Sequence, residues 1–311
     1  MDILDIISKI VCYPLAYVLA YCYFVVRSYG LAIILFTIII KACLIPLGIK
    51  QQKSMLLQVK YQPKMAALQA QYKNDKPKLQ EEMSKLYKEE GYNPLGGCLP
   101  LLIQMPILFG LYNVITHPLT YINGMFPNEI QRVANTLGIT TAANSQKFQI
   151  DVATAINDNF ESVKNLLPQN YMKLNFNFLG LNLSGIPNYQ KPSILWLIPI
   201  VAALTGLAMS IITQRYTVQN AQSKGMSKSL MFMSPAMSLF FTFTFPAGVG
   251  LYWIMSNITG AVQAYVLGEK FNPKKYAEQL KQEEQDKKTS EKLVKKEKRL
   301  NKGSSNNNNK K

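Results

Sequence analysis

The sequence has little of the chemistry on which most enzymes and metalloproteins depend. Its 311 residues include one histidine and four cysteines, and 18 acidic residues stand against 34 basic ones. Cys12, Cys22, Cys43 and Cys98 form no Cys-x-x-Cys pair, so we expect neither a disulfide scaffold nor a structural zinc site. The sequence shows no phosphate-binding loop, catalytic triad or metal-ligand cluster, so we expect neither enzymatic activity nor a cofactor.

The chain is at once strongly basic, with a net charge of +16, and 48% hydrophobic. A basic chain is typical of nucleic-acid binders, whereas an apolar one indicates a large core or a membrane protein. The apolar residues gather in five stretches that approach the roughly 20 residues a bilayer-spanning helix needs. We therefore predict an all-α membrane protein with five transmembrane helices, at residues 29–49, 95–116, 194–213, 229–245 and 247–267. Pro246 separates the last two, because proline cannot continue a helix and marks a tight turn.

A sixth apolar stretch, Ile10–Val26, has two interpretations. Only Arg27 and Ser28 separate it from the next stretch, which we take as too short a link for a transmembrane hairpin. Tyrosines recur along one face, and tyrosine belts and amphipathic helices lie at membrane surfaces. These tyrosines are Tyr13, Tyr17 and Tyr21. We favour an external interfacial helix within residues 1–28, with a first transmembrane span as the alternative.

The basic residues fall almost entirely in three segments. Of the 34, 26 lie in residues 50–92, 214–228 and 268–311, whereas residues 117–193 hold five. With five spans, the three basic segments share one side of the membrane and 117–193 lies on the other. The positive-inside rule then places the basic segments in the cytoplasm, the N-terminus outside and the C-terminus inside.

The segments between the spans differ in character. Residues 50–92 predict a charged cytoplasmic helical hairpin, in which Pro77 lies at the start of the second helix. Residues 117–193 form an external region with weak helical periodicity, and 214–228 a short cytoplasmic loop. The basic cytoplasmic tail, 268–311, alternates Lys and Glu before an Asn-rich end, which predicts a helix passing into disorder.

Lys41 is the one charged residue deep inside an apolar stretch, eight residues before the inner end of its predicted helix. A lone ammonium there costs roughly 2.5–3.5 kcal/mol on insertion scales. Snorkelling of its stem to the cytoplasmic interface is one interpretation. The other is a water-filled groove in the inner leaflet, with Lys41 as a receptor for an acidic residue or a lipid phosphate, because no span carries a carboxylate. Thr37 lies one turn earlier on the same face.

Further polar or aromatic residues in the predicted spans are candidates for lining this groove. Each alone is more typical of packing between membrane helices, but together they would wet one concave surface. The candidates are Gln104 in the second span, Ser210 and Gln214 at the third, and Tyr252, Trp253, Ser256 and Asn257 in the fifth.

Three motifs resemble the YidC/Oxa/Alb family of membrane protein insertases. They are the segment 93–106 (NPLGGCLPLLIQMP), the segment 245–257 (FPAGVGLYWIMSN) and the segment 178–184 (FLGLNLS). The resemblance covers roughly residues 6–268. It implies five core spans around a hydrophilic groove that opens to cytoplasm and lipid and is closed outside. The family's groove cation is typically Arg; Lys41 keeps the charge but loses the planar bidentate fork.

The resemblance implies a non-enzymatic insertase and chaperone in a bacterial cell membrane. Its partners would be nascent membrane proteins and lipids, and partnership with a Sec translocon stays open. The charge of the basic tail predicts contact with ribosomal RNA phosphates, with attraction to anionic lipids or plain solubility as the alternative. We expect no counterpart of the large external domain that precedes the first span in Gram-negative members of the family. Two rival functions stay open: a small transporter or channel with a polar intramembrane pathway, and a structural assembly factor that acts through the cytoplasmic hairpin.

Overall fold

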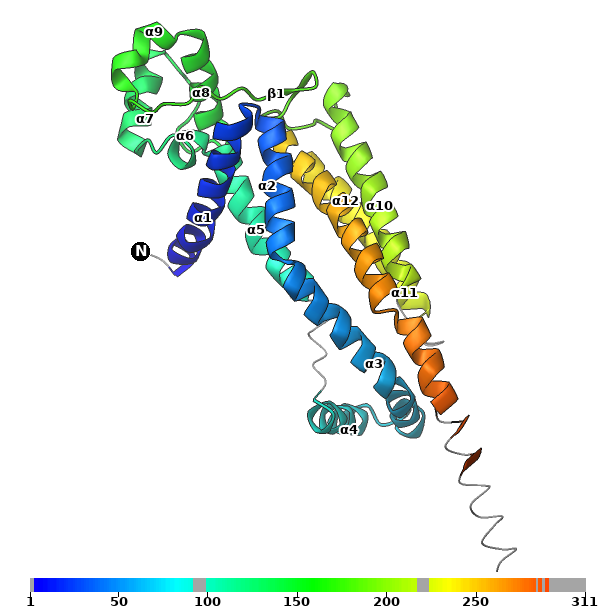
Figure 1. Ribbon diagram of the computed structural model, residues 1–311. Helices are drawn as coiled ribbons and strands as arrows, with labels where there is room; N and C mark the ends of the chain where they lie inside the picture. The colour runs from blue at the N-terminus through cyan, green and yellow to red at the C-terminus, as the bar shows by residue number, and fades with distance from the viewer. Residues whose placement is uncertain (1–2, 92–98, 217–223, 284, 287–288, 291–311) are drawn as a thin grey trace, which may run out of the picture. The chain divides into compact units, whose positions relative to one another are not determined.

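A computed structural model describes residues 3–91, 99–216, 224–283, 285–286 and 289–290 (Figure 1). The described residues are mostly helical, as the sequence predicts. Two compact units share the chain. The larger comprises residues 1–49, 98–215 and 219–266, and the smaller comprises residues 50–97, 216–218 and 267–311.

The larger unit begins with two helices that pack against each other, α1 (Ile3–Val26) and α2 (Tyr29–Cys43). Arg27, with a left-handed φ of +53°, turns the chain between them. A two-residue link is thus long enough to bring these helices into contact, whereas our premise that it is too short for a transmembrane hairpin stays untested. The tyrosine face of α1 is exposed and the opposite face is buried, which fits an amphipathic helix. The interfacial helix stays our prediction for α1, and a first transmembrane span stays its alternative.

The predicted first span is broken at Leu44, where α2 ends and α3 (Ile45–Gln71) begins at a bend of 50°. Pro46 gives the physical reason, since its nitrogen carries no hydrogen to donate and its ring disfavours a helical residue before it. The helix then continues far beyond residue 49, so the apolar span and the charged hairpin share one helix.

Four further helices complete the apolar part of this unit: α5 (Leu99–Thr116), α10 (Leu197–Arg215), α11 (Lys224–Thr244) and α12 (Ala247–Lys270). The start of the predicted second span lies outside the described residues. Helix α10 packs along α11, and α12 follows after a break at Pro246. Gly250 on α12 allows a close approach to Ile198 on α10, because a Cβ there would lie 2.3 Å from the isoleucine Cγ2.

The predicted external region forms a helical subdomain (Figure 1). Its helices are α6 (Pro118–Tyr121), α7 (Pro127–Thr136), α8 (Phe148–Asp158), α9 (Phe160–Val163) and the 3-10 turn η2 (Lys164–Leu166). Ile130, Val133 and Ile156 are fully buried in its core. Two short antiparallel strands, β1 (Asn177–Phe178) and β2 (Leu181–Asn182), and the 3-10 turn η3 (Ile194–Trp196) lead into α10.

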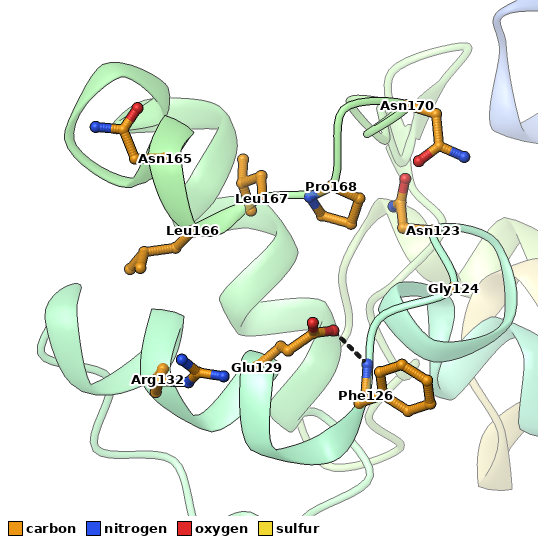
Figure 2. A pocket seen from close by; sticks show the side chains of 10 residues that line it. All are labelled: Asn123, Gly124, Phe126, Glu129, Arg132, Asn165, Leu166, Leu167, Pro168 and Asn170. Carbon is orange, nitrogen blue, oxygen red and sulfur yellow. Dashed lines mark hydrogen bonds between the residues drawn. The ribbon is translucent and has the colours of Figure 1, made fainter.

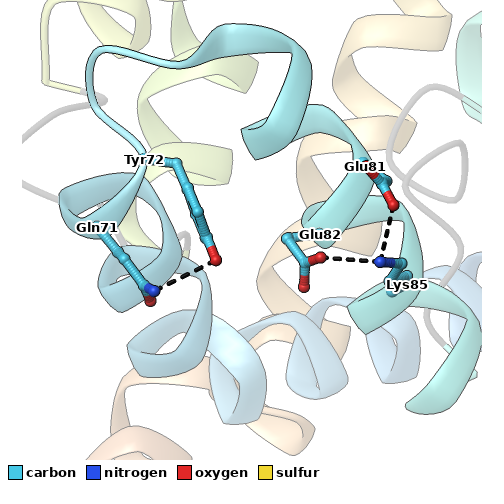
Figure 3. A network of polar contacts seen from close by, with 5 residues as sticks. All are labelled: Gln71, Tyr72, Glu81, Glu82 and Lys85. Atoms are coloured by element: carbon cyan, nitrogen blue, oxygen red, sulfur yellow. Dashed lines mark hydrogen bonds and ion pairs between the residues drawn. The ribbon is translucent and has the colours of Figure 1, made fainter.

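The smaller unit contains the charged part of α3 and a second helix, α4 (Lys76–Glu89). The Asp75 side chain caps α4 by accepting a hydrogen bond from the backbone of Lys78, and Pro77 lies in its first turn. Lys85 binds Glu81 and Glu82 on one face of α4 (Figure 3). Glu90 pairs with Lys64 of α3, a contact that lowers the pKa of the Glu90 carboxyl.

By length and composition, one described helix is apolar and long enough to cross a membrane, residues Ile194–Arg215. The bent pair Tyr29–Cys43 and Ile45–Leu57 would be a second if it counts as one broken span. The five-span architecture therefore stays a prediction at this point.

Candidate functional site

Lys41 lies near the end of α2 and contacts a neutral side chain. Its Nζ donates a long hydrogen bond of 3.4 Å to Oε1 of Gln104 on α5. Gln104 in turn donates from Nε2 to the hydroxyl of Tyr252 on α12 at 2.8 Å. A single polar chain thus joins three helices that are distant in sequence, and we call Lys41, Gln104 and Tyr252 the polar triad.

The polar triad has no acidic member. Among the described residues, no carboxylate lies within ion-pair distance of Lys41. The amide oxygen of Gln104 supplies a dipole rather than a charge, and a cation removed from water without a counter-charge is costly. A negatively charged group near Lys41 would supply the missing counter-charge, and that role of Lys41 stays a prediction.

Apolar side chains of α2 lie beside the polar triad. Phe36 and Ile33 on α2 are fully buried, and the ring of Phe36 lies 6.4 Å from that of Tyr252. Thr37, also fully buried, donates its hydroxyl proton to the carbonyl of Ile33 at 2.7 Å. Its donor is therefore used inside its own helix, one turn before Lys41.

Two other predicted groove residues make packing contacts between helices. The indole of Trp253 donates to Oγ of Ser238 on α11 at 2.7 Å. The amide of Asn257 donates to the carbonyl of Ala202 on α10 at 3.2 Å. Both side chains tie α12 to its neighbours, which corresponds to the packing role that the sequence also allowed.

The remaining candidates lie farther along their helices. Ser210 and Gln214 are half-buried near the end of α10, and Ser256 is buried one turn beyond Tyr252 on α12. A groove role for these three residues stays a prediction.

Sequence reasoning missed the part played by α11. Ser238 is fully buried and accepts the Trp253 hydrogen bond, and Thr242 one turn later is buried as well. Their spacing of four residues in an otherwise apolar stretch is the signal that would have indicated a polar contact with another helix.

The described residues show no metal-ligand cluster. They contain no group of three or more His, Cys, Asp or Glu side chains that could hold a metal ion. Cys12 and Cys22 are buried free thiols and Cys43 is an exposed one, while Cys98 lies outside the described residues.

The external subdomain carries a hollow of about 510 Å³ (Figure 2). Phe126, Arg132 and Leu166 are among its lining residues. Glu129 also lines it, but its carboxylate accepts a hydrogen bond from the backbone of Phe126 at 2.8 Å and so caps α7. This hollow is separate from the polar triad, with which it shares no residue.

Residues 21–275 match the sequence pattern of a family described as 60Kd inner membrane protein. The chain is 31% identical over 263 residues to "Membrane protein insertase YidC" of Streptomyces avermitilis, covering 81% of this chain and 54% of the relative. It is 35% identical over 243 residues to the protein of that name from Chlorobaculum tepidum, covering 78% and 33%. It is 31% identical over 257 residues to "Membrane protein insertase YidC 1" of Listeria monocytogenes, covering 81% and 68%.

The chain thus spans about half of the Streptomyces relative and a third of the Chlorobaculum relative. A solved structure, "Active YidC insertase crystal structure with the first transmembrane domain resolved", shares 25% identity at a TM-score of 0.49. That likeness covers 83% of this chain and 46% of the other, and the score is too low to support the arrangement of the helices.

Proposed function

Because this chain belongs to the 60Kd inner membrane protein family, the YidC/Oxa/Alb family, we propose that it is an insertase and chaperone for nascent membrane proteins. We further propose the five-span topology, with residues 117–193 outside and the basic segments in the cytoplasm of a bacterial cell. The distribution of basic residues supports this orientation.

One observation carries the proposed mechanism: Lys41 is paired only with the neutral amide of Gln104 among the described residues. In a groove open to the cytoplasm, Lys41 would attract acidic residues in the tail of an incoming membrane protein. Water in the groove shortens the distance over which that tail is desolvated, while the apolar surface around Phe36 closes the outer side.

The energy for insertion comes from the substrate and from the membrane. Burial of the substrate's apolar segment in lipid drives partition, and Lys41 contributes only transient attraction. A negative charge that moves outward also gains roughly 2.3 kcal/mol per 100 mV of inside-negative potential. No bond is made or broken, so the process needs no catalytic residue.

The partners follow from the same topology. We propose that α3 and α4 receive the substrate on the cytoplasmic side, and that the basic tail, residues 268–311, attracts ribosomal RNA phosphates in a salt-sensitive manner. Cooperation with a Sec translocon is a further proposal.

Reconstitution tests the function. Liposomes containing the full chain should convert a short single-span protein with an acidic external tail into a protease-protected form, at least several-fold above empty liposomes. The same liposomes should show no substrate-independent ion conductance. Conductance without insertion would contradict the proposal and support the transporter or channel instead.

A further inference from the structure

The hairpin of β1 and β2 has an unusual residue at its tip. The strands pair Asn177 with Asn182 and Phe178 with Leu181, which leaves Leu179 and Gly180 as a two-residue turn. Both have left-handed φ angles, +51° and +78°. Turns of this kind favour Asn-Gly, because a side chain such as leucine is strained there.

The strained leucine is also exposed. Leu179 is 83% accessible, and among the described large apolar residues none is more exposed. A single exposed leucine is ordinary on a protein surface. A leucine that is exposed and strained, in a turn where asparagine would be relaxed, has no stabilising role within the hairpin itself.

The hairpin is firmly attached to two helices. Phe178 packs against Gly30 in the first turn of α2, where a Cβ would lie 2.2 Å from the Phe178 ring. Farther along the same segment, the carbonyls of Leu183 and Gly185 accept hydrogen bonds from Gly248 and Ala247 at the start of α12, each at 2.8 Å. The position of the tip is therefore fixed relative to the first residues of both helices.

The neighbouring 3-10 turn, η3, indicates how deep the hairpin lies relative to the proposed membrane. Strand β2 contacts η3. The segment Ile194–Arg215, which is long and apolar enough to cross a membrane, begins with η3. Ile194 in η3 and Leu197 at the start of α10 are 61% and 51% exposed. In the proposed topology these residues face the outer leaflet, so the tip lies at the boundary between water and acyl chains.

We propose that this hairpin is an outer-leaflet anchor, in which Leu179 inserts into the lipid and holds the outer ends of α2 and α12 at a fixed depth. The partner is the lipid surface, because the contacts of the hairpin place it at the outer ends of apolar helices. This inference rests on the proposed topology and not on insertion activity.

The test uses the full chain with its native cysteines replaced. A single new cysteine replaces Asn177, beside the tip, and carries a fluorophore that nitroxides quench. The protein is reconstituted in liposomes that contain lipids with a nitroxide high on the acyl chain. We expect quenching at least twofold greater than for the same label at Asn165, an exposed residue of η2.

Two substitutions separate anchoring from folding. Leu179→Asn gives the turn its preferred sequence and should reduce lipid quenching at position 177 to the level at 165, whereas Leu179→Met should leave it unchanged. Equal quenching in Leu179→Asn and the unsubstituted hairpin would overturn the proposal. Protection of position 177 from both lipid-borne and aqueous quenchers would also overturn the proposal. It would indicate that the tip contacts another protein or a second copy of this chain.

Sidedness is measured separately. An impermeant maleimide should modify a cysteine at Asn165 in intact cells from which the outer barrier has been removed. Failure of that labelling would contradict the proposed topology, while loss of lipid quenching alone would contradict only the anchor.

Discussion

Replacement of Lys41 by glutamate is expected to abolish the ability of this chain to support a bacterium depleted of its own insertase. The substitution puts a carboxylate where the polar triad now presents its ammonium, beside an amide and a hydroxyl. Acidic tails would then be repelled, and we expect the insertion rate of an acidic-tailed substrate to fall by about tenfold or more, equivalent to about 1.4 kcal/mol or more.

The matched variants identify charge as the cause. Lys41→Arg keeps the charge and should sustain growth, whereas the uncharged Lys41→Met should fall between the arginine and glutamate variants. Equal membrane levels of all three proteins, measured by immunoblot, control for folding. Normal growth with Lys41→Glu would remove the electrostatic role and favour the assembly-factor alternative.

Replacement of Gln104 by glutamate is expected to be nearly as severe, although it leaves Lys41 intact. The side chain of Gln104 already lies 3.4 Å from the ammonium, so a carboxylate there would form an internal ion pair. A substrate would have to displace that pair before it could bind. We expect about a tenfold slower insertion of acidic-tailed substrates, measured in the reconstituted liposomes.

Three variants sharpen this test. Gln104→Met removes the amide without adding charge and should retain most activity. Exchange of the two residues, Lys41→Gln with Gln104→Lys, returns one cation to the same site and should restore part of the activity. Gln131→Glu adds the same charge at an exposed position on α7 and should have no effect. Unchanged insertion with Gln104→Glu would show that Lys41 is not the receptor.

Proline shows how far local sequence reasoning reaches in this chain. The break at Pro246 was predicted, and the structure has it between α11 and α12. The break at Leu44 was not predicted, because Pro46 lies near the end of an apolar run that we took as one continuous helix. The same steric rule applies to Pro46 and to Pro246. Only the structure shows that the chain continues as helix α3 after the break at Leu44.

The polar residues show a different limit. Gln104 and Trp253 were equally plausible in the groove, because spacing identifies a helix face but not the neighbour that it meets. The structure turns Gln104 towards Lys41 and Trp253 towards Ser238. That difference depends on the rotation of α12 against α5 and α11, which is determined by packing over the whole unit.

The external region was the least predictable part. Its weak periodicity indicated no definite elements, yet it folds into α6–α9 around a buried core. The hairpin escaped notice because Leu-Gly is not a usual turn sequence and each strand has two residues.

The central claim is that Lys41 receives acidic segments of an inserting protein. The most direct measurement compares two reporter substrates that differ only in the charge of the translocated tail, one acidic and one basic, with the unsubstituted chain and with Lys41→Glu. We predict that the unsubstituted chain inserts the acidic reporter faster and that Lys41→Glu reverses the ratio. The same ratio in both proteins would contradict the account.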